Sequence, residues 1–274
     1  MRLAPLGLAA ALLAAPAHAA DSPVTLVACA PGYPGTGAEA QSSMDAFAAA
    51  LTKVAGWPAG QVRASYAPTE KEGLTRLGEA QLAVLALPFF LKHAAALRLT
   101  PRLVVQQKGL GPTETWTLVA KKGRVSKPAD MAALTVLSIA GYAPAFVRQV
   151  LGPTWRLPEA TQVTESAQVL SALRRAVKGE DVAVLLDGAQ GNALPTLPFA
   201  AELEVLARSA PLPAALVTTV GSGLPAGRWA SLEKALLALP KDAAGAAALE
   251  GIRMVGFLPA DKATLSAVHA LQGP

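Results

Sequence analysis

Side chains that could hold a small ligand follow directly after apolar, strand-like runs of the sequence. Tyr33 comes after the run 25–30 and offers a ring for stacking and a hydroxyl for hydrogen bonding, although it could equally pack on the rim of a site. Asp187 ends the run 182–186. Its carboxylate could accept hydrogen bonds from a cationic or amine group of a ligand, or could cap the helix that follows. These residue types indicate noncovalent binding.

Enzyme chemistry finds little support in the sequence. No HExxH, GxSxG, CxxC or P-loop motif occurs. His93 falls in a helix-like segment and His269 lies near the C-terminus, so both are predicted to be surface or packing residues. The glycine-rich segment 32–37 lacks the lysine and the spacing of a nucleotide loop, and no Cys/His/Asp cluster suggests a metal. We therefore expect no catalytic residue, no metal site and no cofactor.

The composition is that of a globular chain with a substantial core. Apolar residues make up 52% of the 274 residues, and the formal net charge is +5. The positive charges are scattered, without the aromatic-interleaved basic stripe that nucleic-acid binding needs, so no nucleic-acid partner is expected. Mild basicity favours an anionic small ligand.

Cys29 is the only cysteine, so no internal disulfide is possible. The letters of residues 26–29 match a lipobox, which would give a lipidated N-terminus. A buried thiol at the end of the first strand is the alternative, and we favour it because lipidation there would remove that strand.

The first nineteen residues resemble a secretory signal peptide. Arg2 is followed by an apolar stretch over 3–16 and by the small-x-small motif Ala17-His18-Ala19. A retained membrane anchor is disfavoured, because the stretch is short and is broken by proline and glycine. We expect cleavage after Ala19 and a periplasmic mature protein of roughly 255 residues, soluble after export.

The rest of the chain alternates strand-like and helix-like segments, which is typical of α/β folds. Strands are predicted over 25–30, 62–66, 82–87, 103–107, 115–120, 135–139, 162–164, 182–186, 203–207 and 214–220. Helices are predicted over 42–55, capped by Ser42 or Ser43, over 69–79 with a Thr69-x-x-Glu72 box, from Pro88, over 144–151, from Glu165, and around Leu232, Leu236 and Leu239.

In open α/β sheets, ligands bind beyond the carboxyl ends of the strands. This rule selects four places: the loop 33–36, the residues after the third strand, the loop 138–142, and the end of the run 182–186. The candidate ligand-binding residues at these places are Tyr33, Gly35, Thr36, Phe89, Ser138, Gly141, Tyr142 and Asp187.

Two blocks of sequence resemble a known family. In residues 202–261, a strand-like run leads into Ser209-x-x-x-Pro213, and the block closes on Gly256-Phe257-Leu258-Pro259. Residues 115–137 look like the same family's strand, Lys/Gly turn and helix–strand segment. The order is similar to that of phosphate/phosphonate-type (PhnD-like) periplasmic solute-binding proteins of ABC transporters, and the likeness extends from about residue 25 to 271.

The resemblance implies a two-lobed type 2 periplasmic binding protein fold with two hinge crossings. Lobe one would comprise 20–116 plus 210–274, after a signal peptide over 1–19, and lobe two would comprise 117–209. Thr115 and Trp116 would line the cleft at one crossing, although Trp116 could equally be structural. The implied partners are a small-molecule ligand and an ABC permease, with the membrane reached only through the permease, and the implied state is a monomer without a cofactor.

The loop 138–142 departs from the family pattern. Phosphonate-binding members carry several hydroxyl side chains there, whereas this chain offers Ser138 and the bulky Tyr142. A larger or more apolar ligand is therefore as well supported as an oxyanion. Two further alternatives stay open, because fold does not determine function: a ligand sensor that partners a signalling receptor, and a binding-fold protein that has lost its ligand.

Overall fold

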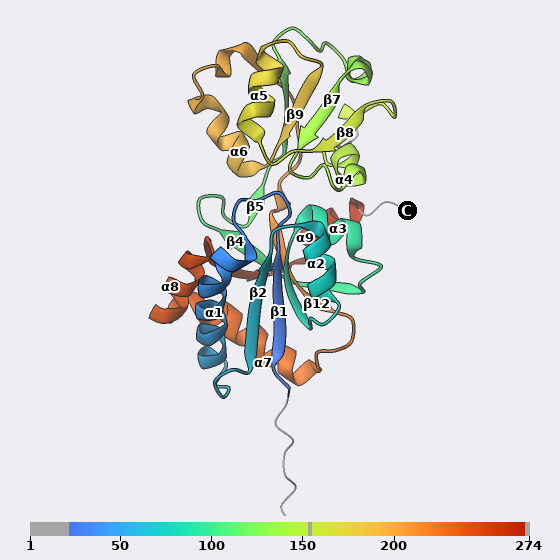
Figure 1. Cartoon of the computed structure of the whole chain (residues 1–274). Helices are drawn as coiled ribbons and strands as arrows, with labels where there is room; N and C mark the ends of the chain where they lie inside the picture. Colours follow the sequence, from blue (N-terminus) through green and yellow to red (C-terminus); the bar gives the residue numbers. More distant parts are fainter. Residues whose placement is uncertain (1–21, 153–154, 272–274) are drawn as a thin grey trace, which may run out of the picture.

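Figure 1 shows two lobes, one above the other, that are joined by a narrow neck. This computed structural model describes residues 22–152 and 155–271. The predicted signal peptide lies outside the described residues. Within the described ranges, the longest helices are too short or too polar to cross a bilayer.

The lower lobe, lobe one, is built on a six-stranded mixed sheet in the order β13-β4-β12-β3-β1-β2. β1 runs parallel to β2 and β3, whereas β12 is antiparallel to both β3 and β4. The bounds are β1 Val24–Cys29, β2 Val62–Ala67, β3 Leu82–Ala86, β4 Leu99–Gln107, β12 Ala215–Val220 and β13 Met254–Pro259.

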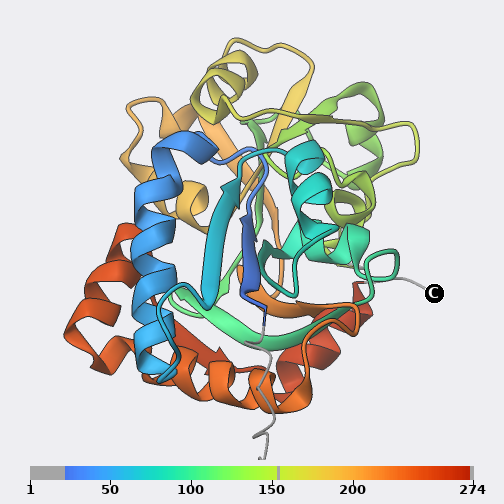
Figure 2. The same ribbon diagram turned by 60° about the horizontal axis from the view of Figure 1, so that its bottom comes forward.

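Helices cover both faces of this sheet, as Figure 2 shows from below. On one face, Phe47 of α1 and Leu236 of α7 pack with Leu26 of β1 in one apolar cluster. On the other face, Phe89 of α3 packs with Val27 and Cys29, so successive residues of β1 serve opposite layers. The bounds are α1 Gly37–Val54, α2 Glu70–Leu77, α3 Leu87–His93, α7 Ala226–Ala238, α8 Ala243–Gly251 and α9 Lys262–Ala270.

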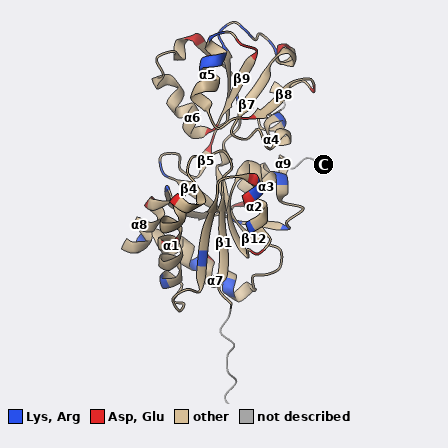
Figure 3. Cartoon of the chain, in the orientation of Figure 1, with Lys and Arg blue, Asp and Glu red and all other residues tan. Residues whose placement is uncertain are grey.

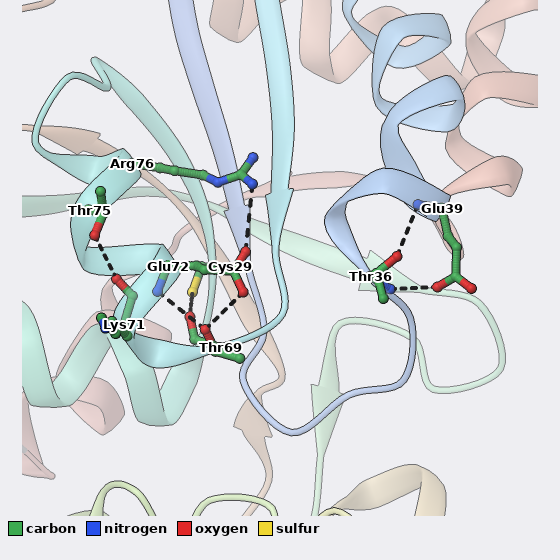
Figure 4. A network of polar contacts seen from close by, with 8 residues as sticks. All are labelled: Cys29, Thr36, Glu39, Thr69, Lys71, Glu72, Thr75 and Arg76. Carbon is green, nitrogen blue, oxygen red and sulfur yellow. Dashed lines mark hydrogen bonds and ion pairs between the residues drawn. The ribbon is translucent and has the colours of Figure 1, made fainter.

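The helix expected from Ser42 or Ser43 begins earlier in the structure. Thr36 caps it: the Glu39 amide donates to the Thr36 hydroxyl over 3.2 Å, and the Thr36 amide donates to the Glu39 carboxylate over 2.7 Å (Figure 4). This reciprocal capping box satisfies two of the free amides at the helix start, which favours a start of α1 at Gly37. The cap predicted at Thr69 is confirmed, since its hydroxyl accepts from the Glu72 amide. The predicted box is not completed, because the Glu72 carboxylate accepts from the Thr69 hydroxyl and not from the Thr69 amide.

The upper lobe, lobe two, is built on a five-stranded sheet in the order β10-β6-β9-β7-β8. β7 is parallel to β8 and β9, and β6 is antiparallel to β9 and β10. The bounds are β6 Thr117–Lys121, β7 Thr135–Ser138, β8 Gln162–Glu165, β9 Val182–Leu186 and β10 Leu203–Arg208, with helices α4 Pro144–Gln149, α5 Val169–Val177 and α6 Gly188–Ala193.

Two short strands form the neck. β5 (Thr113–Glu114) pairs antiparallel with β11 (Leu212–Pro213). Just above them, the Trp116 amide donates to the Ser209 hydroxyl over 2.9 Å, and the Ser209 amide donates to the Trp116 carbonyl over 2.9 Å. The strand expected over 115–120 therefore begins two residues later, at Thr117, because the main-chain amide and carbonyl of Trp116 bond to Ser209.

Candidate functional site

The two lobes meet at a small cleft directly above the neck. Four of its lining side chains can recognise a ligand: Tyr33 from the loop after β1, Tyr142 from the loop after β7, and Trp116 and Glu114 from the crossing. Its free volume is about 10 Å³, close to the smallest space that holds one water molecule. In this closed arrangement, side chains of the protein itself fill the cleft.

Tyr33 and Asp187 join the lobes directly. The Tyr33 hydroxyl donates to the Asp187 carboxylate over 2.8 Å. The two residues follow the carboxyl ends of β1 and β9, so the rule that selected them from the sequence brings them together. Burial raises the pKa of Tyr33, and the negative charge of Asp187 raises it further. Tyr33 therefore keeps its proton and acts as a donor in this bond.

Asp187 is also a helix cap. Its Oδ1 accepts from the Gln190 amide over 2.8 Å, and the Gln190 side chain accepts from the Asp187 amide, which starts α6. Asp187 is only 1% exposed. Burial raises its pKa, although the bonds from Gln190 and Tyr33 oppose that rise. The capping alternative is thus the one seen in the closed form, and ligand contact by Asp187 stays a prediction.

Glu114 is a functional candidate that the sequence interpretation missed. It is 4% exposed on β5, and its Oε2 accepts from the Gly188 amide over 3.0 Å. Burial raises its pKa to about 7; the charge of Asp187 adds to the rise, whereas the Gly188 amide and the Trp116 indole oppose it. A Cβ atom at Gly188 would lie 2.6 Å from the Glu114 Cβ, so this close approach requires glycine.

A sequence signal for Glu114 did exist. A lone carboxylate stands two residues before the tryptophan at the crossing, among uncharged neighbours. Its burial depends on β11 and on the start of α6, which lie far along the chain, and no local pattern reports those contacts.

Trp116 packs as a structural residue and also lines the cleft. Its ring packs edge-on against Phe146 of lobe two, with ring centroids 5.0 Å apart, which makes it structural. Its indole N–H is buried at the cleft and lies close enough to the Glu114 carboxyl to lower its pKa, without making a hydrogen bond of full geometry in the described structure. Such a donor costs free energy unless it meets an acceptor.

Lys92 of α3 makes a second bridge between the lobes. Its ammonium donates to the Tyr142 carbonyl over 2.6 Å and lies 5.8 Å from the centre of the Tyr142 ring. Glu70 holds the same ammonium at 2.5 Å and also contacts His93 at 2.7 Å. His93 packs on Phe89, as expected for a packing residue. This cation is therefore already engaged at the edge of the cleft.

The remaining candidates lie outside the cleft lining in this closed form. Ser138 is buried and its hydroxyl accepts from the Ala140 amide, whereas Gly141 lies against the backbone of β8. Phe89, on α3, is fully buried. Thr115 is half-buried at the crossing, and Gly35 and Thr36 are exposed at the start of α1. Their roles in ligand binding stay predictions.

A larger hollow of about 340 Å³ lies on the outer side of lobe one, between α1 and the edge strand β2. Its polar lining is partly self-paired, because the Gln41 amide donates to both Asp45 and the Ala64 carbonyl. It contains none of the residues that join the lobes. Among the residues that the structure describes, no group of three His, Cys, Asp or Glu side chains is placed to hold a metal.

No protein-family profile matches the sequence, and no curated protein matches it at a significant level. Solved structures do match the fold. XAC2383 from Xanthomonas citri, bound to chloride, has a TM-score of 0.69 at 14% identity, over 91% of this chain and 95% of that one.

The names of two further neighbours refer to phosphonates. The binding protein component of an ABC phosphonate transporter from Pseudomonas aeruginosa (PA3383) has a TM-score of 0.63 at 15% identity, covering 92% of this chain and 86% of its own. PhnD1 from Prochlorococcus marinus, in complex with methylphosphonate, has a TM-score of 0.59 at 13% identity, covering 90% and 96%. The expected fold is confirmed: the chain has the two-lobed α/β fold of the type 2 periplasmic binding proteins, with two crossings between its lobes.

Proposed function

We propose that this protein is an exported solute-binding protein that captures a small ligand between its lobes and delivers it to an ABC permease. One observation carries the proposal. Hydrogen-bonding and aromatic side chains from both lobes converge on one cleft above the neck, at the carboxyl ends of the strands. A ligand held there would contact both lobes at once.

The neck supports a capture mechanism based on lobe movement. Two short strands and the Trp116–Ser209 pair carry the main chain from one lobe to the other near the cleft. Rotation about so small a junction would open the cleft, and contacts from a ligand to both lobes would close it again. The proposed mature protein begins after Ala19, acts as a monomer in the periplasm, and meets the membrane only through its permease.

One observation favours a second candidate, a protein that has lost its ligand. The bonds Tyr33–Asp187 and Lys92–Tyr142 join the protein's own groups across the cleft, and the remaining volume is about 10 Å³. A cleft closed by its own side chains would be the end state of such a loss.

Native mass spectrometry of protein purified from the periplasm separates the two. We expect a bound small molecule that is released on unfolding and that, when added back, raises the melting temperature and lowers the radius of gyration. At a hundred times its Kd, a ligand should stabilise the folded form by about 2.7 kcal/mol. The capture proposal would be wrong if the purified protein carried no ligand and if a periplasmic small-molecule extract changed neither its melting temperature nor its radius of gyration.

A further inference from the structure

We propose that the cleft takes a small organic cation with a protonated amine, and that Glu114 is the residue that selects its charge. This inference rests on the proposed ligand-binding function and names the class of ligand. It starts from the charges at the neck, where Figure 3 shows acidic positions in red beside β5.

The charged side chain in the cleft lining is a carboxyl. Glu114 lines the cleft, and the Asp187 carboxyl is bonded to the lining hydroxyl of Tyr33. Among the described residues, no Lys, Arg or His lies within ion-pair distance of either carboxyl. The nearby ammonium of Lys92 is held by Glu70 and the Tyr142 carbonyl. The site therefore has buried carboxyls without a cation of its own.

The main-chain donors at the start of α6 are already occupied. The Gly188 amide donates to Glu114, and the Gln190 amide donates to Asp187. An oxyanion ligand would have to displace these carboxyls or lie beside them, and like charges in a buried site repel. The protein's own carboxyls thus take the place that an oxyanion would need.

The same carboxyls keep acceptor capacity for a ligand. An ionised carboxylate has about four acceptor positions, and the hydrogen bond from the Gly188 amide uses one of them, on Oε2 of Glu114. A primary ammonium donates three hydrogen bonds and offsets the cost of burying the negative charge. The rings of Tyr33, Trp116 and Tyr142 around the cleft add the faces that attract cations.

The small volume of the closed cleft means that the lobes must open before a cation can enter. With about 10 Å³ free, an ammonium group can reach Glu114 only after the lobes separate and the bond between Tyr33 and Asp187 breaks. On closing, the ammonium would bridge groups of both lobes in place of that bond.

Calorimetric titration of the full mature protein tests the inference with two sets of probes. The cations are ethylammonium and 1,4-diammoniobutane, and the anions are inorganic phosphate and methylphosphonate. We expect the cations to bind, and Glu114→Gln to weaken them at pH 8 by about ten- to a hundred-fold. Glutamine keeps an oxygen for the Gly188 amide. Glu79→Gln, a change at an exposed carboxylate of lobe one, should leave the affinity unaltered.

The pH dependence gives a readout that a structural role alone would not produce. The groups that face Glu114 are Asp187, Tyr33, the Trp116 indole and the Gly188 amide. Because the pKa of Glu114 is about 7, a cation that needs its ionised form should bind about tenfold more tightly at pH 8 than at pH 6. Glu114→Gln should remove this dependence. An anion that needs the protonated form would show the opposite trend.

The outcomes separate this inference from the proposed function. Cation binding that is lost in Glu114→Gln supports both. If phosphate or methylphosphonate binds, and binds Glu114→Gln equally well or better, the cation inference is wrong but ligand capture still holds. A co-purifying ligand without positive charge would have the same meaning. Binding of neither probe set, together with no co-purifying ligand, overturns both.

Discussion

Glu114 places an ionisable group where the folded chain shields it from water. Its pKa rises from an ordinary value of 4.5 to about 7, chiefly because burial penalises the charged form. The folded protein then holds this proton more tightly than the unfolded chain does. Stability should therefore fall as the pH rises from about 4.5 through about 7, which is the reverse of the usual behaviour of a carboxylate.

Replacing Glu114 by glutamine should remove the loss of folding stability at high pH. Without ligand, Glu114→Gln should be more stable than the wild type at pH 8, by up to about 3 kcal/mol, and close to it at pH 5. Urea denaturation at the two pH values measures the difference, with Glu79→Gln as the exposed control. An equal effect of Glu114→Gln at both pH values would show that ionisation of Glu114 is not its cause.

Of the two buried carboxyls at the cleft, Asp187 could be predicted from the sequence and Glu114 could not. Asp187 stands at the end of a continuous apolar run, so the strand-end rule finds it, and the same rule finds Tyr33. Glu114 lies on a strand of two residues whose partner is almost a hundred positions away. Neither periodicity nor a local motif reports such a contact, so the buried charge appears only once the neck is assembled.

At the scale of the elements, the sequence predicted type and order better than boundaries. The apolar runs of β9 and β12 mark buried strands without ambiguity. The strand β13 was not recognised, because Gly256 and Pro259 weaken a strand signal. It pairs with β4 at the edge of the lobe-one sheet, where proline is tolerated.

Gly141 illustrates how a residue chosen for a site can have a packing role. A Cβ atom there would lie 2.3 Å from the Glu165 amide nitrogen, and the main chain of β8 cannot move aside cheaply. We expect Gly141→Ala to cost about 1–3 kcal/mol and to lower the melting temperature by several degrees.

Gly227 in α7 is the matched control, because a Cβ atom there would meet nothing within 4 Å. Gly227→Ala should be neutral or stabilising by up to about 1 kcal/mol. Thermal unfolding of the two variants checks the pair. Equal melting temperatures would show that the contact between Gly141 and β8 does not constrain the fold.

The neck depends on one side-chain acceptor. Ser209→Ala would leave the buried Trp116 amide without the hydroxyl that now accepts from it, at a cost of about 1–3 kcal/mol. Ser209→Thr keeps a hydroxyl and should retain most of the stability. Denaturant unfolding of both variants provides the comparison, and a Ser209→Ala variant as stable as wild type would mean that water replaces the hydroxyl.

At the scale of the whole molecule, the lobes are held together by a few direct bonds. Tyr33→Phe removes the donor to Asp187, and a hydrogen bond to a charged group contributes about 1.5–3 kcal/mol. The open form should gain in population by roughly ten- to a hundred-fold. Small-angle scattering without ligand should then show a larger radius of gyration.

Tyr66→Phe is the control for that measurement, since the Tyr66 hydroxyl donates to the Ala30 carbonyl within lobe one. It should leave the scattering curve unchanged. If Tyr33→Phe and the wild type gave identical scattering curves, the contact between Lys92 and Tyr142 would be enough to keep the lobes closed.

The position of β12 has a consequence for the order in which the chain assembles. β12 lies between β3 and β4 in the lobe-one sheet, yet it is made only after all strands of the lobe-two sheet. The strands β6 to β10 are contiguous in sequence and can complete their sheet first. Until residues 215–220 arrive, β3 and β4 each present an open edge, which is the kind of edge that pairs with other chains. A nascent chain that stalls before β12 would therefore carry a finished upper lobe on an aggregation-prone lower one.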